Sequence, residues 1–500
     1  MKKYIIYSLL ALMPFTWGCE DDFLTTTPDD QLTVEAFYRN VTDAEGALAT
    51  VYAQIGASDR WDVTEVNFVV EHFRSDMCMP GPDRYADWTA ISTFTNTAGN
   101  SRSTIYWEDA YRGLNHANQV IEKVGAMTDD KIKPEEREQI VAEAKFLRGL
   151  LHFRLLNNWD KVILQEAAPT SEEELEKSLS EREAVWALIE QDFSDAAMGL
   201  PVVHEKSNLG RATKGAAIGF LGKALLHQGK FGEAAAEFKK IVEDGVGGEY
   251  ALVDNFMSNF DGSNENNKES VFEIQYSSVR VNGRHIGHVS GKFASAPETG
   301  GWGNIEATQN LVTEFKSEGM IATTGKYDSR LYATLFFDDP DVDVFGESFE
   351  DVFGTGSERA IFRKFTLSNI PESDNAAWYS SQNIPLMRYA DVLLMYAEAL
   401  NESGSASAAK PFIDEVRQRA DMPALPSGLS QEEMRNRIMH ERAVELAFEG
   451  HRFFDLRRWG NSVLEDKMQN SGKPGAGNFK LDAHAFFPVP ESETNSNGAL

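Results

Sequence analysis

Cysteine is scarce in this sequence, and the positions of its two cysteines exclude a disulfide-stabilised fold. Of 500 residues, only Cys19 and Cys78 are cysteines. Cys19 follows Gly18 at the end of a segment that resembles a secretion signal, so Cys78 is left alone in the body. We therefore expect Cys78 to be a small buried apolar residue without a catalytic role.

Long apolar runs are also missing. The apolar run at residues 4–13 is too short to span a bilayer, and no later stretch reaches the roughly 18 residues that a membrane helix needs. Lys2 and Lys3 before this run, and Cys19 after it, are typical of a lipoprotein signal peptide. We predict a signal peptide at residues 1–18, a lipid on Cys19 and a flexible polar tether at residues 19–31.

Basic residues are few relative to acidic ones. The chain has 48 Lys and Arg against 78 Asp and Glu, which gives a formal net charge of −30. A charge of this sign repels phosphate backbones and anionic lipid surfaces at long range, so we expect no nucleic-acid partner. Hydrophobic residues make up 42% of the chain, which is ample for a large core.

Catalytic motifs do not occur. The chain has neither a Gly-x-Ser-x-Gly elbow nor a Walker loop. His440-Glu441 begins like a zinc-protease helix, but Val444 stands where the second zinc-binding histidine is needed. We therefore expect no enzyme of these classes, no zinc and no cofactor.

One acidic stretch partly matches a calcium-binding loop. Its oxygen donors stand at the first, third, fifth and twelfth positions of such a loop: Asp339, Asp341, Asp343 and Glu350. Val344 replaces the glycine that the turn requires. We favour a solvated acidic loop here and keep calcium as the alternative.

Helical hairpins are the clearest pattern in the chain. Apolar and small residues between 213 and 245 fall at the offsets of a tetratricopeptide unit, and residues 393–416 repeat these offsets around Gly404. Two long helical patterns at residues 107–124 and 134–159 predict a third hairpin. The chain is therefore predicted to be mainly α-helical, with tetratricopeptide-like helix-turn-helix repeats.

The middle of the chain has a different character. Gly, Asn, Asp and Ser become frequent between residues 249 and 380, and short runs such as residues 271–276 are typical of strands. Helical patterns lie on both sides of this loop-rich region, and no linker separates them. We predict one domain over residues 32–500, with loop-rich insertions at about 60–105 and 249–380.

Charged residues recur on one apolar helix near the C-terminus. Glu441, Glu445 and Glu449 are spaced four residues apart among apolar side chains. We expect an ion network that fixes helix packing rather than a catalytic carboxylate pair. The arginines that follow in sequence are the predicted partners: Arg442, Arg452, Arg457 and Arg458.

Aromatic residues in loops are the candidates for ligand binding, because the apolar face of a sugar ring packs on an aromatic ring while polar groups take its hydroxyls. One cluster lies early in the chain and another in the glycine-rich stretch 300–304. The alternative for each tryptophan is a place in the core. The candidates are Arg74, Asp76, Tyr85 and Trp88, and then Trp302 and Asn304.

Several segments together resemble the SusD/RagB family of surface lipoproteins from Bacteroidetes. They are the start after Cys19, the segment EATQNLVTEF followed by residues 328–331, the segment HERAVELAFEGHRFFDLRRWG, and the ending FFPVPESETNSN. The resemblance implies an α-helical, SusD-like outer-membrane lipoprotein that sits as a lid on a TonB-dependent transporter of the SusC type. It also implies the capture of glycans, or of peptides as in some relatives.

Three functions stay open at this point. A glycan-binding surface lipoprotein is the leading hypothesis, and a peptide-binding relative is the nearest alternative. A glycosidase is the alternative from another class, although the sequence offers no isolated pair of acids in a recognisable frame.

Overall fold

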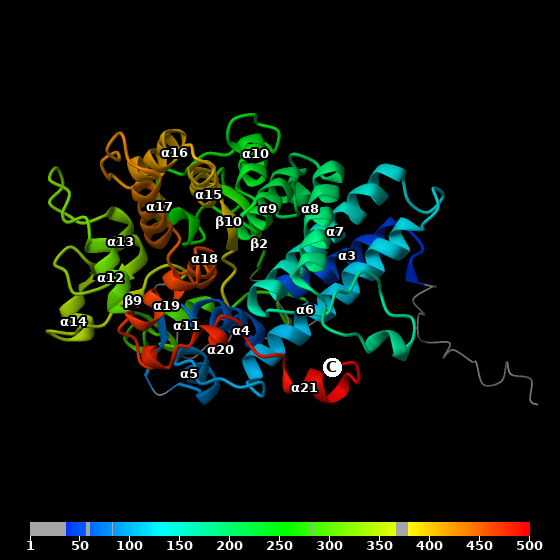
Figure 1. Cartoon of the computed structure of the whole chain (residues 1–500), viewed down its shortest axis with the longest axis horizontal. Helices are drawn as coiled ribbons and strands as arrows, with labels where there is room; N and C mark the ends of the chain where they lie inside the picture. The colour runs from blue at the N-terminus through cyan, green and yellow to red at the C-terminus, as the bar shows by residue number, and fades with distance from the viewer. Residues whose placement is uncertain (1–36, 57–60, 83, 278, 282–283, 367–378) are drawn as a thin grey trace, which may run out of the picture.

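The computed structural model describes residues 37–56, 61–82, 84–277, 279–281, 284–366 and 379–500 (Figure 1). The predicted signal peptide, the tether and Cys19 lie outside these residues. Within the described ranges, no helix combines the length and the apolar character needed to cross a membrane.

Helices make up most of the fold, as predicted. The longer ones are α3 (Val41–Gly56), α4 (Trp61–His72), α6 (Ser101–Gln119), α7 (Pro134–Asn158), α8 (Arg182–Gly199), α9 (Lys214–His227), α10 (Phe231–Val242), α15 (Tyr389–Glu402), α16 (Ala406–Arg419) and α17 (Gln431–Glu445). Shorter ones are α5 (Ala86–Ser92), α11 (Ser290–Ala294), α12 (Gln309–Lys316), α13 (Ser329–Thr334), α14 (Phe349–Phe353), α18 (Arg452–Arg458), α19 (Asn461–Gln469), α20 (Leu481–His484) and α21 (Glu491–Ser496).

The long helices pack in succession as an array. Contacts join α3 to α6, α6 to α7, and so on through α8, α9, α10, α15, α16 and α17, and Figure 1 shows them side by side across the molecule. The predicted helix pairs α6–α7, α9–α10 and α15–α16 are all confirmed. The turns of the last two pairs use Gly229 and Gly404, which adopt positive φ values of 73° and 86° that favour glycine.

Small residues bring the helices of a pair close together, as the pattern predicts. A Cβ atom on Gly222 of α9 would lie 2.6 Å from the ring of Phe238 on α10. Only glycine leaves room for that ring, so the contact between α9 and α10 depends on this position.

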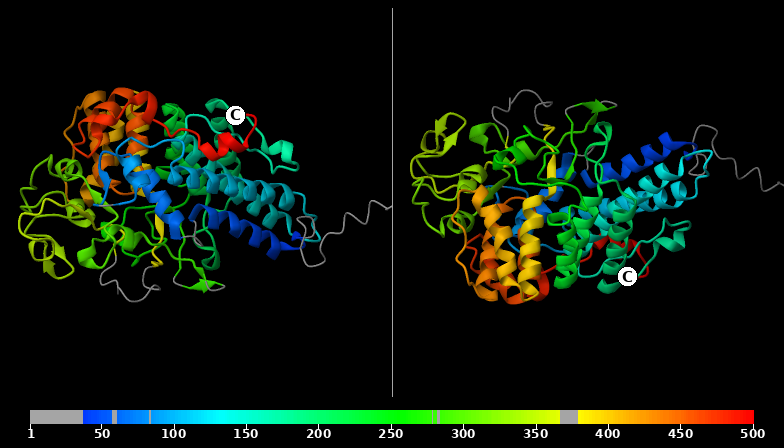
Figure 2. Two further views of the ribbon diagram at one scale, coloured as in Figure 1. Left: turned by 90° about the horizontal axis from the view of Figure 1, so that it is seen from below. Right: turned by 90° about the horizontal axis from the view of Figure 1, so that it is seen from above.

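Short strands occur only between or beside the helices in the described residues, and each pairs with one antiparallel partner. The pairs are β1 (Cys78–Pro80) with β5 (Ile305–Ala307), β2 (Ser270–Ile274) with β10 (Ile384–Arg388), β3 (Arg280–Val281) with β4 (Arg284–His285), β6 (Leu335–Phe336) with β9 (Ile361–Phe362), and β7 (Asp343–Val344) with β8 (Glu347–Ser348). Figure 1 places β2 and β10 between α9 and α15, and Figure 2 shows the yellow-green part of the middle region at one end of the molecule. The loop-rich middle is thus confirmed, although it also contains short helices.

One large cluster of buried apolar side chains runs through the array and the middle region, from Tyr38 to Phe487. A smaller cluster joins Phe94 to α18, α19 and Phe479. Cys78 is buried in the large cluster, where burial raises the pKa of its thiol to about 12, as suits a structural residue.

The charged C-terminal helix forms the predicted ion network. Arg330 of α13 lies 3.0 Å from Glu441 and 3.2 Å from Glu445, and all three side chains are fully buried. Arg388 reaches Glu445 at 2.9 Å and Glu449 at 2.7 Å. Buried carboxylates of this kind are stable only when cations face them, so the network ties α13, β10 and α17 together.

The predicted partners of this network were wrong. Arg442 pairs with Asp391 and Asp455 instead, at 2.7 and 2.9 Å. Arg452, Arg457 and Arg458 also bind other groups, because α18 starts after a turn at Gly450 and directs them to Asp76, to Asn157 of α7 and to Glu398 of α15. Closeness in sequence did not decide the pairing.

Candidate functional site

The two loops that sequence analysis singled out come together in space. Strand β1 pairs with β5 so that Cys78 faces Ala307 and Pro80 faces Ile305. The backbone N–H of Gly81 then donates to the carbonyl oxygen of Asn304 at 3.0 Å. More than 200 residues separate these segments, and the strand pair makes them one surface.

Arg84 fastens the two loops to each other. Its Nε donates to the carbonyl oxygen of Gly303 at 3.1 Å, and its Nη2 donates to the carbonyl oxygen of Trp302. A Cβ atom on Gly81 would lie 1.9 Å from the Gly303 oxygen, so the loops approach as closely as glycine allows. The backbone around Tyr85 and Trp302 is therefore held rigidly.

Tyr85 and Trp302 are the two aromatic candidates that solvent reaches. Tyr85 has 60% of its surface exposed and touches Trp88 edge-on, with ring centroids 4.8 Å apart. Trp302 is half-buried, and its backbone N–H donates to the carbonyl oxygen of Lys292 at 2.7 Å. That either ring contacts a ligand stays a prediction.

Trp88 and Asn304 lie inside the protein instead of on this surface. The stretch expected to be a loop contains the short helix α5, which turns Trp88 into the core against Phe293, with ring centroids 5.4 Å apart. Asn304 is also buried, and its backbone N–H donates to the carbonyl oxygen of Phe293 at 3.0 Å. In this conformation both residues support the loops and are unsuited to direct contact with a ligand.

Arg74 and Asp76 are buried as well. Asp76 accepts two hydrogen bonds of 2.9 Å from Arg452. The guanidinium of Arg74 lies 4.3 Å from the ring centroid of Phe453 and 4.0 Å from that of Phe487. Burial, aided by the nearby charge of Arg457, holds the pKa of Arg74 well below its usual range. Both side chains join distant segments of the chain rather than facing a ligand.

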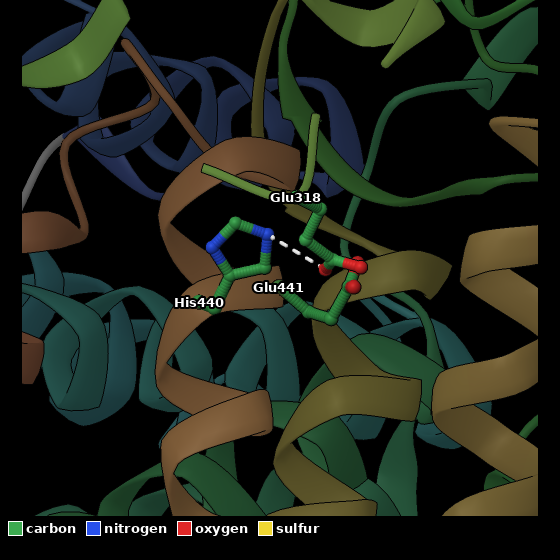
Figure 3. A group of neighbouring side chains, drawn as sticks. All are labelled: Glu318, His440 and Glu441. Carbon is green, nitrogen blue, oxygen red and sulfur yellow. Dashed lines mark ion pairs between the residues drawn. The ribbon is translucent and has the colours of Figure 1, made fainter. Parts of the chain in front are cut away.

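One group of side chains has the residue types and spacing of a metal site. Atoms of Glu318, His440 and Glu441 lie within 4.8 Å of one another, and Figure 3 shows the imidazole directed at Glu318. However, Nη1 of Arg417 lies between the two carboxylates, 2.8 Å from Glu318 and in an ion pair with Glu441. The carboxylates already have a cation, so the group is better described as an ion network.

The state of His440 supports this description. Its Nδ1 lies 2.8 Å from Glu314 and its Nε2 lies 3.2 Å from Glu318. Burial alone would lower the pKa of His440, but the two carboxylates outweigh it and raise the pKa to about 9. A protonated imidazole has no lone pair for a metal.

The acidic stretch at 339–350 forms a hairpin rather than a metal cradle. Asp343 accepts a hydrogen bond from the backbone of Gly346 at 2.6 Å, and Asp341 pairs with Lys326 at 3.0 Å. Asp339 and Glu350 do not join them in a group of metal ligands within the described part of the chain. This favours the solvated acidic loop over the calcium alternative.

Arg84 and the glycines of the two loops were missed by sequence analysis. Residues 300–303 contain three glycines, a signal that another backbone approaches closely. Nothing in the sequence shows that the approaching segment is Gly81–Arg84, because that contact depends on the pairing of β1 with β5.

The protein is an array of helices with a rigid surface formed by loops that are distant in sequence. This architecture is typical of α-helical binding proteins. A family model described as the SusD family matches residues 268–500, and a second, described as "Starch-binding associating with outer membrane", matches residues 22–226. Together they cover most of the chain. The chain belongs to the SusD/RagB family.

Relatives and solved structures agree with this assignment along the whole chain. SusD-like protein P2 of Formosa agariphila is 26% identical, over 100% of this chain and 99% of the relative. A SusD superfamily protein of Bacteroides vulgatus has a TM-score of 0.83 at 25% identity, covering 93% of this chain and 98% of the other. A SusD-like carbohydrate-binding protein of Bacteroides fragilis has a TM-score of 0.77 at 25% identity, covering 93% and 99%.

Proposed function

We propose that this protein is a cell-surface lipoprotein of the outer membrane that captures glycans without transforming them. Cys19 carries the lipid, residues 19–31 form the tether, and residues 32–500 form the binding body. The protein delivers oligosaccharide or polysaccharide to a SusC-type TonB-dependent transporter. The family membership supports this role, as does the likeness to a protein described as carbohydrate-binding.

The main support for the proposal is that Arg84 joins the two aromatic loops by hydrogen bonds. Tyr85 and Trp302 are each attached to backbone that Arg84 or the β1–β5 pair holds in place. Aromatic rings held in advance lose little conformational entropy when a sugar packs on them, so a preorganised face binds more tightly. A pyranose ring would pack on Tyr85 and on the accessible part of Trp302.

The charge state of Glu445, in the C-terminal segment, argues against a role for it in hydrolysis. A glycosidase needs one carboxyl group that stays protonated near neutral pH. Burial alone would raise the pKa of Glu445, but Arg419, Arg388 and Arg330 outweigh it and hold the pKa below its usual range. Glu445 is thus a permanent anion within a structural network and is unsuited to act as a general acid.

Calorimetric titration of the mature protein with a panel of oligosaccharides tests the proposal. We expect saturable binding of at least one neutral glycan and no release of sugar from it. Failure of every glycan to bind, with peptides found by mass spectrometry in the purified protein, would favour the peptide-binding alternative. Sugar release that one Asp or Glu substitution abolishes would favour the glycosidase. Co-purification of a SusC-type transporter with this protein from outer membranes tests the transporter partner.

A further inference from the structure

A large groove lies on a different set of residues from the aromatic loops. It runs between the start of α8, the segment that follows α7, helices α18 and α19, and residues 477–488, and its cavity volume is about 1270 Å³. This exceeds the roughly 300–1,000 Å³ of a pocket for one small molecule and suits a chain of several sugar units.

The walls of the groove offer many polar atoms beside the half-buried side chains of Leu481 and Phe486. Trp186, Phe479 and Phe487 line it, but they are 7%, 2% and 4% exposed, so little of their surface is available. Asn461 and Gln469, two exposed residues of α19, also line the groove. Such a lining suits a ligand rich in hydroxyl groups better than an apolar partner.

Two arginines of this groove lie near the same aromatic ring. The guanidinium carbons of Arg182 and Arg457 are 5.0 and 4.2 Å from the ring centroid of the same residue, Phe486. Burial, followed by the charge of Arg182, lowers the pKa of Arg457 to about 9. Two cations are therefore held close together in a chain whose net charge is −30.

Within the described residues, Arg457 has no carboxylate among its hydrogen-bond partners, and Arg182 has only a long ion pair with Asp160. Arg457 donates to the carbonyl oxygens of Asn157 and Ala485 and to the side-chain oxygen of Asn157, all of which are neutral. Arg182 directs Nη1 at three carbonyl oxygens, and the carboxylate of Asp160 lies 3.7 Å away with 62% of its side chain exposed. By contrast, the neighbouring Arg458 pairs with Glu398 at 2.8 Å and with Asp455 at 2.8 Å.

The remaining donors of Arg182 have nothing to bind in the described part of the chain. Its Nε and Nη2 donate no hydrogen bond there, and the side chain is 27% exposed, so an incoming group can reach them. A guanidinium edge with two free donors matches a carboxylate or a sulfate oxygen pair.

We infer that the groove is a second glycan-binding site, selective for a sugar residue that bears a carboxylate or sulfate group. The acidic group binds Arg182 beside Arg457, and the hydroxyls of neighbouring sugars bind Asn461 and Gln469. Glu465 and Asp482, which also line the groove, oppose acidic ligands and limit the site to a ligand with few charges. That the ligand is a glycan rests on the proposed function. The location of the site rests on the groove itself.

Calorimetry of the mature protein with three pentasaccharides tests the inference: one with a single uronic acid, one with a single sulfate group and one neutral. We expect at least one of the two acidic pentasaccharides to bind. Comparing their affinities shows whether the site prefers a carboxylate or a sulfate group. Arg182→Gln should weaken that binding about tenfold, as expected for the loss of a charge-assisted pair. Arg112→Gln is the matched control, because it removes the same charge from a side chain that is 45% exposed and outside the groove.

Two substitutions on the exposed face of α19 keep the test decisive if Arg182→Gln disturbs the end of α7. Asn461→Asp should weaken the acidic ligand a few-fold and Glu465→Gln should strengthen it a few-fold, because they change the local charge in opposite directions. Tyr85→Ala should leave this binding unchanged, whatever it does to neutral glycans. Absence of acidic-ligand binding, insensitivity to all three groove variants, or loss in Tyr85→Ala alone would overturn the inference.

Discussion

Arg452 and Asp76 form a two-point ion pair across 376 residues of chain, with Nε to Oδ1 and Nη2 to Oδ2 both at 2.9 Å. Asn310 donates a third hydrogen bond to the same carboxylate at 3.0 Å. Arg452 begins α18, Asp76 precedes β1, and Asn310 follows β5. The pair therefore joins the C-terminal segment to the two strands that position the aromatic loops.

Asp76→Asn should lower the free energy of unfolding by about 3 kcal/mol, because it leaves the largely buried Arg452 without its counter-ion. Urea denaturation measures the loss. Asp129→Asn is the control, since Asp129 is 71% exposed and its pair with Arg137 should be worth less than about 1 kcal/mol. Equal losses in the two variants would show that the Asp76 pair does not anchor the loops.

Tyr85→Ala should weaken binding of a neutral glycan about tenfold, which corresponds to about 1.4 kcal/mol, by removing a stacking surface. Tyr85→Phe keeps the ring and should bind nearly as well as the wild type. Because Tyr85 is 60% exposed, the free energy of unfolding should change by less than about 0.5 kcal/mol. Unchanged affinity in Tyr85→Ala would place the glycan elsewhere. Calorimetry and denaturation provide the two readouts.

The helical array was predictable from sequence because its signals are local. Apolar residues at helical spacing and glycines at turns, such as Gly229 and Gly404, report structure within about 30 residues. The family resemblance then supplied the overall fold. Helix α5 was not predicted, because seven residues are too few to show a helical period. Trp88 was therefore expected in a loop.

The candidate site was less predictable because it depends on contacts between distant segments. Aromatic residues in two loops pointed to one candidate surface, but burial separates Tyr85 from Trp88 only once α5 packs on Phe293. In the same way, the spacing of Glu441 and Glu445 indicated that cations must face them. Which arginines do so follows from the placement of α13 and β10, and no local pattern encodes that.

Gly222→Ala should lower the free energy of unfolding by about 1 to 3 kcal/mol, because the new methyl group would overlap the ring of Phe238. Gly232→Ala is the matched control in the same helix pair. No atom lies within 4 Å of a Cβ atom there, so the higher helix propensity of alanine should stabilise the protein by up to about 1 kcal/mol. Destabilisation in both variants would mean that close packing at Gly222 is not the cause.

His440 should make stability depend on pH, and the sign follows from its two carboxylate neighbours. The pKa is about 9 in the folded protein and roughly 6.5 in the unfolded chain, so the folded state binds more protons between these values. The contribution of His440 is complete below about pH 6.5 and is lost as pH rises through 9. By linkage it amounts to at most about 3 kcal/mol.

The measurement must isolate His440, because two buried lysines act in the opposite direction. Burial lowers the pKa of Lys364 to about 8 and that of Lys473 to about 7, so their contributions raise stability as pH increases over the same range. Unfolding of the wild type and of His440→Gln should therefore be compared at each pH from 6 to 10. Glutamine keeps a hydrogen-bond donor but no charge, so the stability advantage of the wild type should shrink steadily as pH rises. A constant difference would mean that His440 is neutral in the fold, which would reopen the group with Glu318 and Glu441 as a site for a metal.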